Sequence, residues 1–139
     1  LGLLCARYGV RTGVLVSALL FGLWHLYLGQ PPLDAIILFT TTFVLGLTSA
    51  VVTLHYANLG PALGLHVLWN VAGYLSAAAG HGPFWDAWAE TFSTPWTLEL
   101  VVNGEMIRTL IIPLLIETLI VFAACRSTVL KLIGSPPAP

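Results

Sequence analysis

Two histidines and one asparagine stand in otherwise apolar segments, at spacings that suit a shared chemical site. His66 and Asn70 are four residues apart in ALGLHVLWNVAG, and His25 ends the apolar stretch LFGLWH. Residues four apart share one face of a helix, with Cβ atoms about 5–6 Å apart. A neutral imidazole can bind a metal or stabilise an oxyanion, and an asparagine amide can do the latter. Because such residues are costly inside a membrane, the pattern favours a functional site.

Hydrolysis needs more than these three residues. A carboxylate usually activates the water, and a catalytic zinc ion commonly takes three protein ligands. Apart from Asp34, which is expected to lie outside the membrane at the start of its segment, Glu117 is the only carboxylate within an apolar segment of sufficient length to span a bilayer. It is a candidate base, although a protonated glutamate that pairs helices is the preferred interpretation. A purely structural alternative exists for His25, His66 and Asn70 as well. Each could form a hydrogen bond between helices, which contributes about 0.6 kcal/mol on average to the stability of a membrane protein.

The composition predicts that membrane helices position these residues. Hydrophobic residues make up 58% of the 139-residue chain and charged residues only 8%, with a mean hydropathy of +0.92. A soluble domain carries about 25% charged residues. The net charge of −1 gives no argument for nucleic-acid binding. We therefore expect a lipid bilayer as a partner and no nucleic acid.

Four apolar segments are long enough to cross a bilayer, which requires about 20 residues. They are residues 12–28, 33–54, 59–78 and 109–130, and an acidic, tryptophan-containing loop at 80–105 precedes the last one. Four crossings put Arg7, Arg11, Arg126 and Lys131 on one side, which satisfies the positive-inside rule. The predicted fold class is an all-α, multi-pass transmembrane bundle of about four helices with both ends cytoplasmic. Residues 1–133 form its core, and residues 134–139 are predicted to be a disordered tail.

The motifs over residues 1–74 resemble those of the CAAX protease and bacteriocin-processing enzyme (CPBP or Abi) family of intramembrane metalloproteases. Phe21-Gly-Leu-Trp-His25 fits its FxxxH motif, and His66-Val-Leu-Trp-Asn70 fits its HxxxN motif. The resemblance implies that His25 positions the attacking water or binds a metal. It also implies that His66 and Asn70 complete the catalytic site and stabilise the oxyanion. His25 and His66 are the candidate ligands of a divalent metal such as zinc, whose requirement is disputed for the family.

One motif of that family is missing from this sequence. The family's Glu-Glu-xxx-Arg motif supplies the carboxylate that activates water, and the sequence contains no such motif. Because the chain begins with Leu1 rather than Met, we expect it to be the C-terminal part of a longer protein and inactive by itself.

These observations predict an intramembrane endopeptidase that hydrolyses a peptide bond near the bilayer. Its expected partner is a protein or peptide substrate, prenylated or bacteriocin-like, and its expected location is a prokaryotic cytoplasmic membrane. The alternatives are a non-catalytic membrane scaffold or immunity-type protein, and a small transporter fragment. The depths of His25, His66 and Asn70 in their segments predict that all three face one interior cavity.

Overall fold

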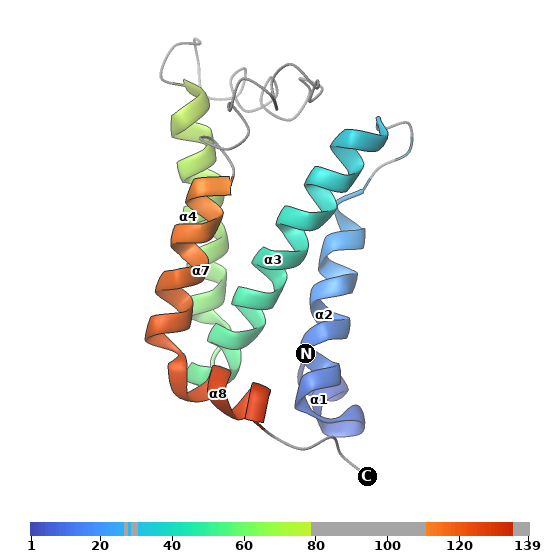
Figure 1. The fold of residues 1–139 in the computed structure, drawn as a ribbon, viewed down its shortest axis with the longest axis vertical. Coiled ribbons are helices and arrows are strands. Elements are labelled where there is room, and N and C mark those ends of the chain that lie inside the picture. The colour runs from blue at the N-terminus through green and yellow to red at the C-terminus, as the bar shows by residue number, and fades with distance from the viewer. Residues whose placement is uncertain (27, 29–30, 79–110, 135–139) are drawn as a thin grey trace.

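A computed structural model describes residues 1–26, 28, 31–78 and 111–134, and throughout these ranges its regular elements are helices (Figure 1). The predicted all-α class is therefore confirmed. The loop predicted at 80–105 lies outside the described residues, as does the predicted tail beyond Gly134. The helices are α1 (Gly2–Tyr8), α2 (Val10–Trp24), α3 (Pro32–Tyr56), α4 (Gly60–Ala78), α7 (Ile112–Ala124) and α8 (Arg126–Gly134).

Helix α3 is the central element. Helix α2 packs against one side of it, and α4 and α7 pack against the other (Figure 1). Among the described residues, α3 is the one helix that is both long and apolar enough to cross a membrane, with 25 residues and a mean hydropathy of 2.1. Helix α2 and the Leu114–Ala124 part of α7 are apolar but shorter. The number of spans and the cytoplasmic position of both ends stay predictions.

The outer faces of the other long helices are apolar as well. Leu20 on α2 is 56% exposed, Leu68 on α4 is 68% exposed and Leu119 on α7 is 66% exposed. Soluble monomers rarely expose apolar patches larger than a few hundred Å². Hydrocarbon chains of a bilayer would remove these side chains from water, so the surface fits a membrane-embedded bundle.

Small residues allow α2 and α3 to approach closely. Ala18 is fully buried, and a Cβ atom added to Gly46 would lie 3.0 Å from the Cα atom of Ala18. The same added atom would lie 3.3 Å from the Cβ atom of Phe21. Small residues are the usual means by which backbones of membrane helices come together. The close crossing seats Phe21 against α3.

A tight turn joins α3 to α4 and makes the two helices antiparallel neighbours. Ala57 ends α3 in the left-handed conformation with a φ of 49°, which satisfies the geometry of a helix C-terminus. The Asn58 side chain then accepts a hydrogen bond of 2.9 Å from the backbone N–H of Gly60 at the start of α4. Beyond this turn, α3, α4 and α7 share a buried apolar cluster of Val52, Ala62, Val121 and Cys125.

The segment predicted as one helix at 109–130 is divided in the structure. Helix α7 ends at Ala124, Cys125 leaves helical geometry with φ −105° and ψ 20°, and α8 begins at Arg126. Helix α8 lies across the end of the bundle instead of continuing along α7 (Figure 1). Because α8 carries Arg126 and Lys131, this turn keeps both charges at the end of the bundle.

Two polar contacts hold α8 in place. Arg11 of α2 donates hydrogen bonds to the backbone carbonyls of Leu132 and Ile133, where the last carbonyls of α8 lack helical partners. At the other side, Nδ1 of His55 lies 3.0 Å from the Thr128 hydroxyl. The start of α2 and the whole of α8 therefore lie at the same end of the bundle, as the charge distribution requires.

Candidate active site

His25 lies immediately after the last residue of α2, as its C-cap, and not within a continuing helix. Its Nδ1 atom is 2.7 Å from the backbone carbonyl oxygen of Phe21. Because a carbonyl oxygen only accepts, Nδ1 must carry the hydrogen, and Nε2 of the neutral ring keeps its lone pair. Among the described residues, Nε2 of His25 has no hydrogen-bond partner, so it can accept a hydrogen bond from water.

Phe21 brings the two histidines together. Its ring centroid lies 4.6 Å from that of His25 and 5.5 Å from that of His66, the latter in an edge-on arrangement. The histidines of the FxxxH and HxxxN motifs, which come from α2 and α4, therefore contact one aromatic ring.

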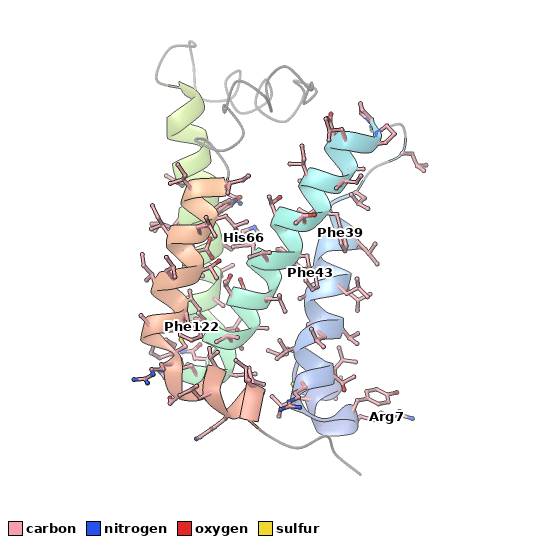
Figure 2. The ribbon with its side chains drawn as sticks, viewed as in Figure 1. Arg7, Phe39, Phe43, His66 and Phe122 are labelled. Carbon is pink, nitrogen blue, oxygen red and sulfur yellow. The ribbon has the colours of Figure 1, made fainter. Side chains whose placement is uncertain are left out.

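His66 lines a pocket of about 390 Å³ among α2, α3 and α4. Phe21 and Ser17 of α2 contribute to its wall, as do Ser49 and Thr53 of α3. Figure 2 shows His66 on the side of α4 that is turned toward α3. The volume falls in the range of about 300–1,000 Å³ typical of small-molecule pockets. A histidine, an aromatic ring and hydroxyl groups thus share a mostly apolar cavity.

Asn70 lies one helical turn beyond His66 on α4 and is exposed. Of the three predicted site residues, only His66 lines the pocket; His25 is reached through Phe21. The wall from α4 includes Ala62 and Leu63 but ends at His66. The described residues therefore join the two histidines, whereas the role of Asn70 stays a prediction.

Glu117 lies in a separate contact between α3 and α7. It is 9% exposed, and its Oε1 atom lies 3.0 Å from the Thr48 hydroxyl oxygen. That hydroxyl also lies 2.9 Å from the carbonyl oxygen of Leu45. The Thr48 hydroxyl either shares its hydrogen between these two acceptors or, with Glu117 protonated, donates to Leu45 and accepts from Glu117. Glu117 does not line the pocket, so the geometry agrees with the helix-pairing interpretation.

The described residues do not by themselves complete a metal site. Within the ranges that the structure describes, no three or more His, Cys, Asp or Glu side chains are grouped so that they could hold a metal ion. His25 and His66 are one ligand short of the three that a catalytic zinc commonly takes. Metal binding by these two histidines stays a prediction, and the chemistry below is derived from the side chains alone.

The sequence alone does not predict two residues of the pocket wall. Phe21 begins the FxxxH motif, but its contact with His66 depends on how α2 and α4 are arranged around α3. Ser49 was not singled out at all. The sequence pattern that indicates Ser49 is the spacing of small residues along this segment, which places them on one face of a helix. These residues are Gly46, Ser49, Ala50 and Thr53.

A comparison with protein families gives a match over residues 1–72, to the family described as type II CAAX prenyl endopeptidase Rce1-like. The matched range is more than half of the 139 residues and contains His25, His66 and Asn70. No curated protein and no solved structure matches the chain.

Proposed function

The chain belongs to the Rce1-like family of type II CAAX prenyl endopeptidases, a family of membrane-embedded proteases, and on that premise we propose that it carries part of an intramembrane proteolytic site. The observation that supports the proposal is the packing of both His25 and His66 against Phe21, which lines the pocket together with His66. This contact unites the two histidine motifs from different helices. The reaction is hydrolysis of a peptide bond by water.

Each histidine has a distinct role in the proposed reaction. The free Nε2 atom of His25 accepts a hydrogen bond from the attacking water and orients it. His66 donates a hydrogen bond to the carbonyl oxygen of the scissile bond, where negative charge develops in the transition state. The Asn70 amide provides a second donor to that oxygen. The reaction also needs a base that removes the proton from water, the part that the family's Glu-Glu-xxx-Arg carboxylate plays, and the 139 residues contain no such motif.

The proposed substrate is a peptide that ends in a prenylated cysteine motif, as the family description indicates. Leu59 and Leu63 of the pocket wall offer apolar contact, and the His66 imidazole offers hydrogen bonding. A lipid-modified peptide presents both kinds of surface. The exposed apolar faces of the bundle place such a cavity within reach of a substrate held in the bilayer.

The test is cleavage of a fluorogenic prenylated CAAX peptide by the full-length gene product in lipid nanodiscs. His25→Ala and His66→Ala should each lower kcat/KM by about 10²–10⁴-fold, since each removes a group that orients or polarises a reactant. Asn70→Ala should lower it by about 10²–10³-fold, as loss of one oxyanion donor does. Leu68→Ala, on the same helix but outward-facing, is the matched control and should cleave normally. Unchanged cleavage in all three site variants would overturn the assignment.

A further inference from the structure

Three hydroxyl side chains line the pocket, and two of them have partners in their own helices. The Ser17 hydroxyl donates to the carbonyl oxygen of Gly13 at 3.0 Å, and the Thr53 hydroxyl donates to the carbonyl oxygen of Ser49 at 2.8 Å. The hydroxyl oxygen of Ser49 is buried and has no hydrogen-bond partner among the described residues. Ser49 is therefore the pocket hydroxyl with unused hydrogen-bonding capacity.

The Ser49 hydroxyl does not make the bond that serine usually makes within its own helix. Serine in a helix commonly donates to the carbonyl four residues earlier, which for Ser49 is that of Leu45. In α3 this carbonyl is already in contact with the Thr48 hydroxyl at 2.9 Å. The Thr48 hydroxyl faces α7 and Glu117, whereas Ser49 forms part of the pocket wall on the other side of α3.

The surroundings of Ser49 suit a peptide main chain. Gly46 and Ala50 flank it on the same wall, and His66 stands across the pocket on α4. Small side chains let another backbone approach a helix closely. A buried hydroxyl without a partner costs about 1–3 kcal/mol, and buried polar groups in native proteins are almost always bonded to protein, water or ligand.

We infer that Ser49 is a substrate-binding residue whose hydroxyl donates a hydrogen bond to a main-chain carbonyl of the bound peptide, close to the scissile bond. The inference rests on the proposed peptidase function and adds a residue to its substrate site. Ser49 takes no part in bond making or breaking. Its bond fixes the register of the peptide relative to His66.

The experiment compares Ser49→Ala with two matched controls in the full-length gene product. Ser49→Ala should lower kcat/KM by about three- to tenfold, mainly through a higher KM, because it removes one neutral hydrogen bond to the substrate. Ser17→Ala and Thr53→Val remove hydroxyls of the same wall that bond to their own helices, and both should keep the wild-type kcat/KM. A merely structural Ser49 would lower the thermal unfolding midpoint; the substrate-binding residue should leave it unchanged or raised.

A modified substrate identifies the acceptor. Peptides with a single thioamide at successive positions replace one carbonyl oxygen at a time with sulfur, a poorer acceptor. When the thioamide stands at the position that Ser49 contacts, wild type and Ser49→Ala should cleave that peptide with equal kcat/KM. Equal kcat/KM for Ser49→Ala and wild type, with His66→Ala inactive, would overturn the role of Ser49 and leave the peptidase function intact. Equal turnover by wild type and His66→Ala would instead contradict the proposed function.

Binding gives the same comparison without turnover. A non-cleavable prenylated ketomethylene peptide with a fluorescent label should bind Ser49→Ala about three- to tenfold more weakly than wild type, again the value of one neutral hydrogen bond. Ser17→Ala and Thr53→Val should bind it like wild type. Equal dissociation constants for wild type and Ser49→Ala would contradict the inference.

Discussion

The pocket and the Glu117 contact lie on two sides of α3 and use adjacent residues of that helix in opposite ways. Ser49 lines the pocket, and its buried hydroxyl has no partner in the described residues. Thr48 faces α7 with a hydroxyl that contacts both Leu45 and Glu117. A polar group with spare capacity beside a cavity can act on a ligand, whereas one that is bonded within a packed interface holds helices together.

Glu117 shows that a buried ionisable residue need not belong to the reactive site. Its second oxygen, Oε2, has no partner in the described part of the chain. Burial of such an oxygen costs far less in a neutral carboxylic acid than in a carboxylate, and the contact with Thr48 is complete when Glu117 is protonated. In the proposed function, this side of α3 serves packing and the other side serves chemistry, because an acid in its protonated form cannot accept a proton from water.

Among residues that do not themselves react, Phe21 should have the largest effect on kcat/KM, because its ring contacts both histidines. Phe21→Ala should lower kcat/KM by about 10²-fold, since misplacement of reacting groups by about 1 Å has that cost. The measurement is steady-state cleavage of the prenylated peptide. Phe43→Ala is the matched control. The Phe43 ring stacks on the Phe39 ring within α3, with 5.9 Å between the ring centroids, and it contacts neither histidine ring. Equal losses in Phe21→Ala and Phe43→Ala would mean that aromatic packing in general, and not the histidine contact, supports activity.

Substitutions at Glu117 should affect stability instead of activity. Glu117→Ala should lower the free energy of unfolding by about 1–3 kcal/mol, because it removes a buried hydrogen bond. Glu117→Gln should be near neutral, since its amide N–H can donate to Thr48 as the protonated acid does. Reversible unfolding in detergent micelles measures both. If the Glu117→Gln variant folds normally but loses cleavage as fully as His66→Ala, Glu117 would be the catalytic base after all.

The smallest expected effect lies at the end of the bundle, far from either side of α3. Arg11→Gln removes donors from the Leu132 and Ile133 carbonyls, and it should cost about 1 kcal/mol or less because the contact is partly solvated. Hydrogen exchange of the α8 amides should become faster, with cleavage unchanged. If the α8 amides of Arg11→Gln exchange at the wild-type rate, contacts other than those of Arg11 hold α8 in place.

The boundaries of two helices could be predicted well because local signals end them. Segments predicted at 33–54 and 59–78 correspond to Pro32–Tyr56 and Gly60–Ala78, which are bounded by proline and by the Ala57–Asn58 turn. The segment predicted at 12–28 ends earlier, at Trp24. The break at Cys125 has a weaker signal, because the polar run Arg126-Ser127-Thr128 follows it but neither proline nor glycine intervenes. The direction of α8 depends on tertiary contacts, since Arg11 and His55 bond to it.

The candidate site was predictable in its residue types and only partly in its geometry. Motif spacing identified His25 and His66, and the structure joins them. Spacing also placed Asn70 on the face of His66, but the pocket ends one turn earlier along α4. The free hydroxyl of Ser49 could not be predicted, because it depends on which hydroxyl contacts the Leu45 carbonyl, a matter of side-chain rotamers.

The most direct test of the central claim is one cleavage assay of the full-length gene product with the prenylated peptide, comparing wild type, His66→Ala and Glu117→Gln. The account predicts that His66→Ala loses about 10²-fold or more in kcat/KM, as loss of a transition-state donor does, while Glu117→Gln cleaves like wild type. Both variants should fold, as measured by their unfolding midpoints. Loss of cleavage in Glu117→Gln together with normal cleavage in His66→Ala would contradict the account, because it would place the chemistry on the α7 side of α3.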